Sequence, residues 1–146
     1  MNSNQFASQP FLPLIGRVAM AAIFLISGIG KLMAPAATIG YIGSLGLPAP
    51  ALGYAGALGL ELLAGAMLIV GFRTRAVAAL LALYALATAV LFHHALADQN
   101  QMFHFLKNLA MAGGLLQVVA FGAGAYSIDA RRDSATRKAG IAAATN

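Results

Sequence analysis

The sequence predicts an all-α integral membrane protein, a bundle of four transmembrane helices with a short interfacial helix in the first outer loop. Of its 146 residues, 60% are hydrophobic and only 9% are charged, against about 25% charged residues in ordinary soluble domains. Four apolar segments lie near residues 12–33, 51–71, 76–97 and 99–123. Each has about the 20 residues that a helix needs to cross a bilayer. Frequent glycine and alanine, without an alternating polar pattern, argue against strands of a membrane β-barrel.

The first half of the chain contains two of these spans. Residues 1–11 are expected to form a flexible N-terminus, and Pro13 suits the first turn of the helix that follows. The small residues around Pro35 would allow cleavage as a signal peptide, but no basic residue precedes Arg17 and the apolar run is longer than a signal sequence. The uncharged segment 35–50 is too broken for a span, and a short interfacial helix is expected around residues 36–44.

The second half of the chain contains clear signals for where helices begin and end. Pro50 begins the second span and Gly71 ends it. Asp98 and Gln101 have the spacing of a capping box, which predicts the start of the fourth helix. The membrane domain is therefore expected to cover residues 12–126. Residues 127–146 form a basic tail that we expect to be partly disordered.

The distribution of basic residues predicts the topology. The net charge is +5, but no Lys or Arg occurs between residues 32 and 72 or between 76 and 106. Arg73 and Arg75 occupy the short second loop, and four more basic residues lie in the tail. Because such residues mark cytoplasmic loops, both termini are expected in the cytoplasm of a bacterial-type inner membrane. Arg17, Arg73 and Arg75 are interpreted only as topology anchors, and no nucleic-acid partner is implied.

One acidic residue lies in the middle of a predicted span. Glu61 is about ten residues into the second span, ~15 Å below the outer surface at the rise of an α-helix. A charge in hydrocarbon costs ~3 kcal/mol or more, so such residues face the bundle interior and find partners. Lys107 of the fourth span and Lys31 at the outer end of the first are both candidates. The sequence predicts a polar pocket in the outer half of the bundle, with Glu61 paired with one of them.

Other polar side chains are expected beside Glu61. Asn108 and His104 share one side of the fourth helix with Lys107. His93 and His94 end the third span, and only one of these neighbours can point inward. From the residues alone, Glu61, Lys107 and either His93 or His94 are the candidates for catalysis, and Lys31, Asn108, His104 and the other histidine are the candidates for ligand binding.

Structural roles would also explain these residues. A buried Glu–Lys pair can fix the register of helices, and Lys31 alone would serve as an anchor at the interface. A histidine of the third span together with His104 could ligate haem. Two histidines near one end of a helix bundle are common, however, so this pair does not predict a haem site. No metal site is expected, because zinc would need a third ligand and Asp98 is assigned to a helix cap.

Several stretches together resemble the DoxX family of small four-helix membrane proteins. They are GRVAMAAIFLISGIGKL, LPAP, LELLAG, GFRTR, FHH, FLKNLAMAGGLLQ and GAGAYSID, spread over about residues 12–130. The resemblance implies an association with membrane oxidoreductases, including a thiosulfate:quinone oxidoreductase subunit and thiol or superoxide defence. It also implies that Lys31, Glu61, His93, Lys107 and Asn108 occupy functional positions, with His94 as an extra histidine.

Three functions are compatible with these observations. The first is a quinone-linked redox subunit, in which quinone is the expected cofactor and a partner protein supplies electrons. Because the chain has no cysteine, thiol chemistry would have to come from the substrate or the partner. The second is a non-catalytic membrane scaffold or assembly factor. The third, a small-solute carrier, lacks the broken-helix pairs and repeats that such proteins use. The faces rich in small residues would also suit a homodimer in the lipid bilayer.

Overall fold

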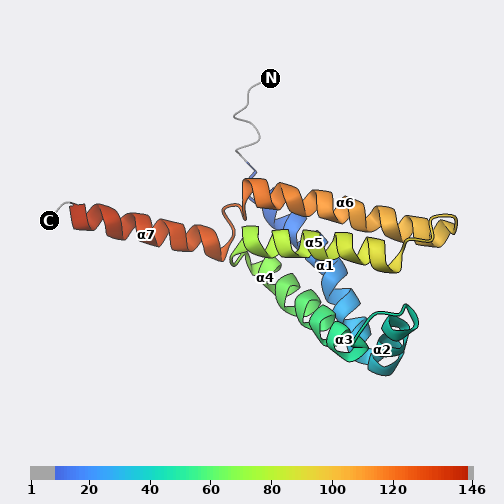
Figure 1. Ribbon diagram of the computed structural model, residues 1–146. Coiled ribbons are helices and arrows are strands. Elements are labelled where there is room, and N and C mark those ends of the chain that lie inside the picture. The colour runs from blue at the N-terminus through green and yellow to red at the C-terminus, as the bar shows by residue number, and fades with distance from the viewer. Residues whose placement is uncertain (1–8, 145–146) are drawn as a thin grey trace, which may run out of the picture.

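The computed structural model describes residues 9–144, which form helices and the turns between them (Figure 1). Most of the N-terminus expected to be flexible, residues 1–8, lies outside the described residues. The helices are α1 (Leu12–Met33), α2 (Pro35–Ser44), α3 (Pro50–Gly59), the π-helical segment η2 (Leu60–Ala64), α4 (Gly65–Val70), α5 (Thr74–Phe92), α6 (Gln99–Phe121) and α7 (Ile128–Ala144).

The predicted fold class is confirmed. Four helices are long and apolar enough to cross a membrane: α1, the continuous helix α3–η2–α4, α5 and α6. Their surfaces expose large apolar side chains, such as Ile26 at 71%, Leu52 at 75% and Leu83 at 66%. Exposing such area to water is unfavourable by ~25 cal/mol per Å², and lipid chains would cover it instead. The short helix α2 follows α1 directly, as the sequence predicted.

The helix ends follow the sequence signals at most positions. Pro13 and Pro50 lie in the first turns of α1 and α3. Gly71 ends α4 in the left-handed conformation, with φ of 70°. The carboxylate of Asp98 accepts a hydrogen bond of 2.9 Å from the backbone N–H of Gln101 and so caps α6.

Two helices differ from the sequence prediction. The third span ends at Phe92 instead of reaching residue 97, because His93 leaves the helical conformation with φ of −132°. The tail, expected to be partly disordered, forms α7. The Ser127 hydroxyl accepts a hydrogen bond of 3.1 Å from the N–H of Ala130 and caps its first turn. The alanines that follow favour the helix.

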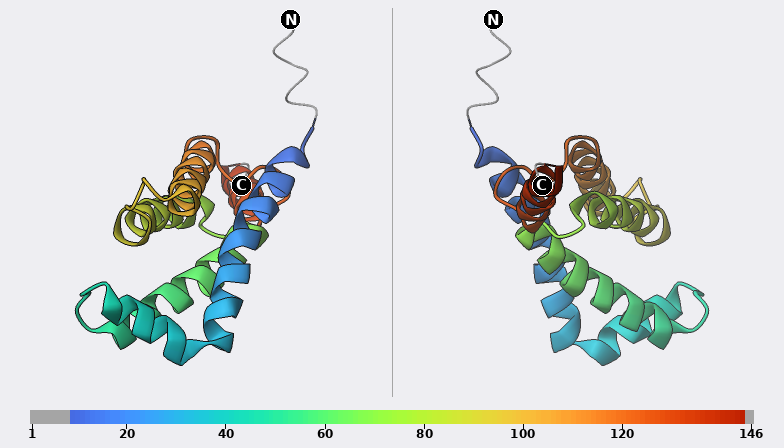
Figure 2. Two further views of the ribbon diagram at one scale, coloured as in Figure 1. Left: turned by 90° about the vertical axis from the view of Figure 1, so that its right-hand side faces the viewer. Right: turned by 90° about the vertical axis from the view of Figure 1, so that its left-hand side faces the viewer.

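The spans form two antiparallel pairs. One pair is α1 with α3–η2–α4, and the other is α5 with α6. The pairs meet where α1 and α5 begin, and they diverge toward α2 (Figures 1 and 2). We call the meeting point the basic end, because it carries Arg17, Arg73 and Arg75, and the other the opposite end. Helix α7 extends away from the bundle beyond the basic end (Figure 1).

Small side chains fill much of the core between the pairs. Alanines recur at helical spacing along one face of α5, which lets the neighbouring helices approach closely. Phe24 of α1 packs against Tyr84 of α5, with ring centroids 6.4 Å apart. The buried core residues of the spans are Ala21, Phe24, Ala64, Leu68, Val77, Ala78, Leu81, Ala82, Ala85, Met111, Ala112 and Leu115.

A buried guanidinium connects the elements of the basic end. Arg17 is 0% exposed. Its Nη1 donates to the carbonyl oxygens of Leu68 at 2.9 Å and Ile69 at 3.0 Å, and its Nη2 donates to that of Tyr126 at 2.6 Å. Two of these carbonyls belong to the last turn of a helix, which lacks helical partners and favours a cation. The interpretation of Arg17 as a topology anchor alone is therefore wrong.

One carboxylate fixes α7 to α5. Asp129 Oδ1 accepts a hydrogen bond from the N–H of Arg73 at 2.8 Å. Its Oδ2 accepts from the N–H and the hydroxyl of Thr74, at 2.8 and 2.7 Å. Burial by itself would raise the pKa of Asp129, but these hydrogen bonds and the nearby Arg132 lower the pKa below its ordinary value. A Cβ on Gly71 would collide with Arg17 and Ser127, so this junction requires glycine.

We expect Arg17→Leu to destabilise the protein by about 3 kcal/mol, because it leaves three carbonyl oxygens without their charged donor. Thermal unfolding of detergent-purified protein would measure the change. Arg137→Leu, on the exposed surface of α7, is the control and should lie within about 0.5 kcal/mol of wild type. Equal melting temperatures for all three proteins would contradict the role given to Arg17.

Candidate functional site

Glu61 lies within η2, a single π-helical segment in the middle of the second span. Such segments are rare and frequently occur at functional sites. The residue is buried, at 3% exposed. Because Glu61 is the only acidic or basic residue between Pro50 and Val70, its charged partner comes from another helix.

Three donors from two other helices contact the Glu61 carboxylate. Lys31 Nζ lies 2.9 Å from both Oε1 and Oε2. The hydroxyls of Ser27 and Tyr84 donate to Oε1 at 3.1 and 2.8 Å. Lys31 Nζ also donates to Ser27 Oγ at 2.8 Å. We call Ser27, Lys31, Glu61 and Tyr84 the Glu61 cluster.

The Glu61 cluster is more open on the side of the lysine. The side chain of Lys31 is 22% exposed and that of Glu61 is 4% exposed. Lys31 lies one turn after Ser27 on α1, so its long side chain folds back along the helix toward the carboxylate. An ammonium, two hydroxyls and a carboxylate thus form one continuous hydrogen-bond network. The accessible ammonium can also donate to an anionic or carbonyl oxygen.

A glycine allows the two helices to approach at this level. A Cβ on Gly28 would lie 2.7 Å from Cδ2 and 2.9 Å from Cγ of Leu62, and 3.3 Å from Cβ of Glu61. These distances are shorter than side chains tolerate without displacement. Gly28 therefore sets the spacing at which Ser27 and Lys31 reach Glu61.

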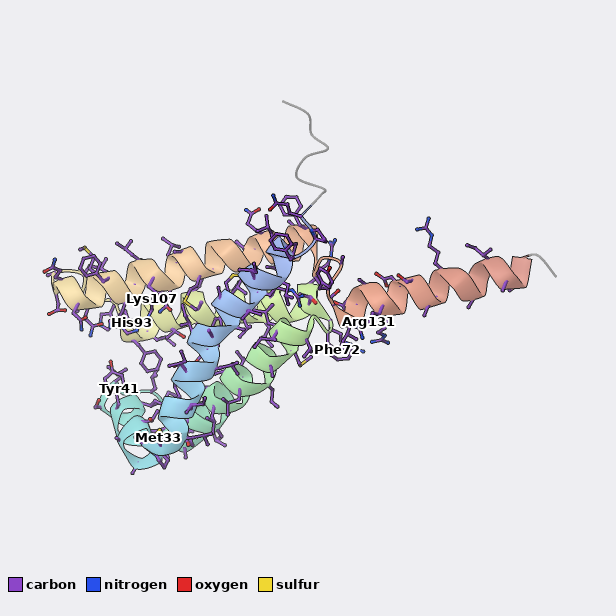
Figure 3. All side chains as sticks on the ribbon, turned by 180° about the vertical axis from the view of Figure 1, so that it is seen from behind. Met33, Tyr41, Phe72, His93, Lys107 and Arg131 are labelled. Atoms are coloured by element: carbon purple, nitrogen blue, oxygen red, sulfur yellow. The ribbon has the colours of Figure 1, made fainter. Side chains whose placement is uncertain are left out.

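Of the two partners that the sequence allowed for Glu61, the structure selects Lys31. The exposed Lys107 has its Nζ 3.1 Å from Nδ1 of His104 on its own helix. The rings of His104 and His93 stack, with centroids 4.9 Å apart, and His93 Nδ1 lies 2.9 Å from Gln101 Oε1. His93 and Lys107 thus lie together at the opposite end of the bundle (Figure 3).

The remaining predicted residues occupy two different environments. His94 is exposed, so His93 is the histidine of the pair that contacts the bundle. Asn108 is 7% exposed, and its side-chain amide makes no hydrogen bond to another residue of the described chain. Among residues 9–144, no three His, Asp or Glu side chains gather as a metal ion would require.

Sequence reasoning missed two members of the Glu61 cluster. Ser27 precedes Lys31 by four residues, a spacing that places two side chains on the same face of a helix, and this signal was available. Tyr84 lies in an otherwise apolar helix. Its contact with Glu61 depends on how the two helix pairs align along the membrane, which no local pattern encodes.

A family model described as DoxX matches residues 12–94, which include Lys31, Glu61 and Tyr84. The chain belongs to the DoxX family. A second family model, the SURF4 family, matches residues 58–134 of this DoxX protein and overlaps the first over the second and third spans.

Two curated relatives come from Escherichia coli (strain K12). The inner membrane protein YphA is 39% identical over 130 residues, which are 86% of this DoxX protein and 93% of the relative. The inner membrane protein YqjF is 37% identical over 116 residues, which are 80% of this chain and 88% of the relative. No solved structure matches the chain significantly.

We expect Gly28→Ala to destabilise the protein by about 1–3 kcal/mol, because the added methyl group overpacks the contact with Leu62 and Glu61. Gly30→Ala is the matched control on the same helix, since a Cβ there meets nothing within 4 Å. It should be neutral or slightly stabilising, because alanine favours a helix over glycine. Thermal unfolding in detergent measures both variants, and equal effects would contradict a close approach at Gly28.

Proposed function

We propose that this DoxX-family inner membrane protein is a membrane subunit of a quinone-linked oxidoreductase or of a thiol or sulfur redox system. The Glu61 cluster would be its proton-handling site. The observation that carries the proposal is the contact of an ammonium, two hydroxyls and a carboxylate within the span, around a Glu61 that is 3% exposed. Ionisable groups inside a membrane are costly and usually functional.

The residues of the Glu61 cluster suit a proton route. A bound quinone would supply a two-electron acceptor whose reduction to the quinol takes up two protons. Lys31 is the more exposed member of the ion pair, at 22% against 4% for the side chain of Glu61, and we propose that it receives protons from the membrane surface and transfers them to Glu61. The Tyr84 hydroxyl then lies on the α5 side of the carboxylate, 2.8 Å from Oε1. Electrons would enter from a partner protein, since the chain has no cysteine to exchange a disulfide or hold an iron–sulfur cluster.

The proposal that a quinone headgroup binds here depends on one side-chain amide that has no hydrogen-bond partner in the described chain. A headgroup needs hydrogen bonds to its carbonyl oxygens in an otherwise apolar site. Asn108 lies one turn after His104 on α6 and is 7% exposed as a residue. Its side-chain amide makes no hydrogen bond with the residues that the structure describes. It would therefore serve as the donor to a carbonyl oxygen.

The distribution of charge supports an orientation. The three arginines of the basic end and the basic helix α7 would face the cytoplasm, following the positive-inside rule. Lys31 and the group of His93, His104 and Lys107 would then face the periplasm. We propose that Lys107, the charged residue of this group, contacts an acidic surface of the electron-donating partner.

A scaffold function is the alternative, and one observation favours it. Both oxygens of Glu61 are already bound by donors of the protein itself, as expected of an ion pair that only fixes helix register. Helix α7 projects from the bundle (Figure 1) and would then be the contact for partner proteins.

Mass spectrometry of the organic extract from detergent-purified protein distinguishes these two functions. Wild type is expected to retain quinone, and Asn108→Leu should retain at least about tenfold less, because it removes the amide that would donate to the headgroup and a tenfold change corresponds to about one good hydrogen bond. Lys107→Ala is the control on the same helix, because its exposed ammonium contacts His104, and it should retain as much quinone as wild type. Equal amounts in all three proteins, or none in wild type, would favour the scaffold.

A further inference from the structure

A hollow of about 690 Å³ lies at the basic end, between the start of α5, the end of α6 and the start of α7. Both spans reach the membrane boundary here, since α5 begins at Thr74 and α6 ends at Phe121. The hollow therefore lies at the level of lipid headgroups. Its lining includes three arginines: Arg73, Arg75 and Arg132.

Two of these arginines have no partner among the described residues. The guanidinium groups of Arg73 and Arg75 are exposed and form no hydrogen bond or ion pair with the residues that the structure describes. Nε of Arg75 lies 3.5 Å from the position of a Cβ on Gly122, so its side chain lies along the end of α6. A guanidinium binds phosphate oxygens in a bidentate geometry.

The acidic residues of the lining leave these two arginines available. The Asp129 carboxylate is occupied by three hydrogen bonds, from the N–H of Arg73 and from Thr74. Arg132 lies over the ring of Phe72, 5.6 Å from its centroid, and its charge also acts on Asp129. Asp133, further along α7, also lines the hollow and carries the remaining negative charge.

The other side of the hollow is apolar. Phe121 lines it and is 80% exposed. Ala76 and Ala123 are also in the lining. A ligand that satisfies both sides would have an anionic group and a hydrocarbon chain. Basic pockets at the ends of transmembrane helices bind the headgroups of anionic lipids in this way.

We propose that this hollow binds the phosphate group of an anionic phospholipid through Arg73 and Arg75, with an acyl chain along Phe121. The site is independent of the Glu61 cluster and of the proposed redox function. It gives these two arginines a specific ligand in addition to their role in topology.

Two double variants test the site. Arg73→Gln with Arg75→Gln removes the two free guanidinium groups. Arg131→Gln with Arg137→Gln removes the same charge from α7, outside the lining of this hollow. Each protein is purified in a neutral detergent and mixed with phosphatidylglycerol, with phosphatidylcholine or with inorganic phosphate. Melting temperature and native mass spectrometry of bound lipid are the two measurements.

Phosphatidylglycerol is expected to bind to and stabilise wild type and the α7 variant alike, whereas phosphatidylcholine has a smaller effect. Binding to the Arg73 and Arg75 variant should be roughly thirtyfold weaker, the factor implied by two arginine contacts near a membrane surface. Equal loss in both double variants would mean that only net charge matters and would overturn the site. Stabilisation by inorganic phosphate to the same extent would overturn the assignment to a lipid. If the Arg73 and Arg75 double variant unfolds without lipid, Arg75→Lys takes its place. This variant keeps the charge but should bind phosphatidylglycerol more weakly than wild type, because lysine lacks the bidentate geometry of arginine.

Discussion

A carboxylate inside a membrane has to be neutralised locally, and this requirement determines how the spans of the protein meet. Without partners, Glu61 would cost ~3 kcal/mol or more in hydrocarbon. Helix α1 supplies Lys31 and Ser27, and α5 supplies Tyr84. Because these donors come from both helix pairs, satisfying one side chain aligns the two pairs along the membrane. The close approach at Gly28 and the wide turn of η2 are the backbone features at the same level.

The other buried charge is accommodated in a different way. Arg17 is bound by backbone carbonyls at the end of α4 and beside α7, and it is closed to solvent at 0% exposed. Lys31, in contrast, remains 22% exposed beside its buried carboxylate. One end of the bundle is therefore sealed by an internal cation, while the other presents an ionisable group to the surface. This difference is the physical basis for proposing a functional role for Glu61 and a structural one for Arg17.

The sequence predicted the membrane class, the four spans, the short helix after the first span and the cap at Asp98, because each depends on local composition or spacing. It also identified Glu61 as the central residue, since a charge in an apolar run is visible in isolation. The choice of Lys31 over Lys107, and the contribution of Tyr84, depend on the relative heights of helices that are distant in sequence. The burial of Arg17 was missed for a related reason: its acceptors are backbone carbonyls, which no side-chain pattern reveals. The helix in the tail was missed because its composition resembles that of disordered segments.

A double-mutant cycle tests the central claim, that Lys31 is the partner of Glu61, most directly. The unfolding free energies of Glu61→Gln, Lys31→Met and the combined variant would be measured in detergent, beside a second cycle that uses Lys107→Met. A coupling of about 1 kcal/mol or more between Glu61 and Lys31 is expected, as for residues in direct contact. The coupling between Glu61 and Lys107 should stay within about 0.5 kcal/mol of zero. Coupling to Lys107 with none to Lys31 would contradict the arrangement of the Glu61 cluster and the functions built on it.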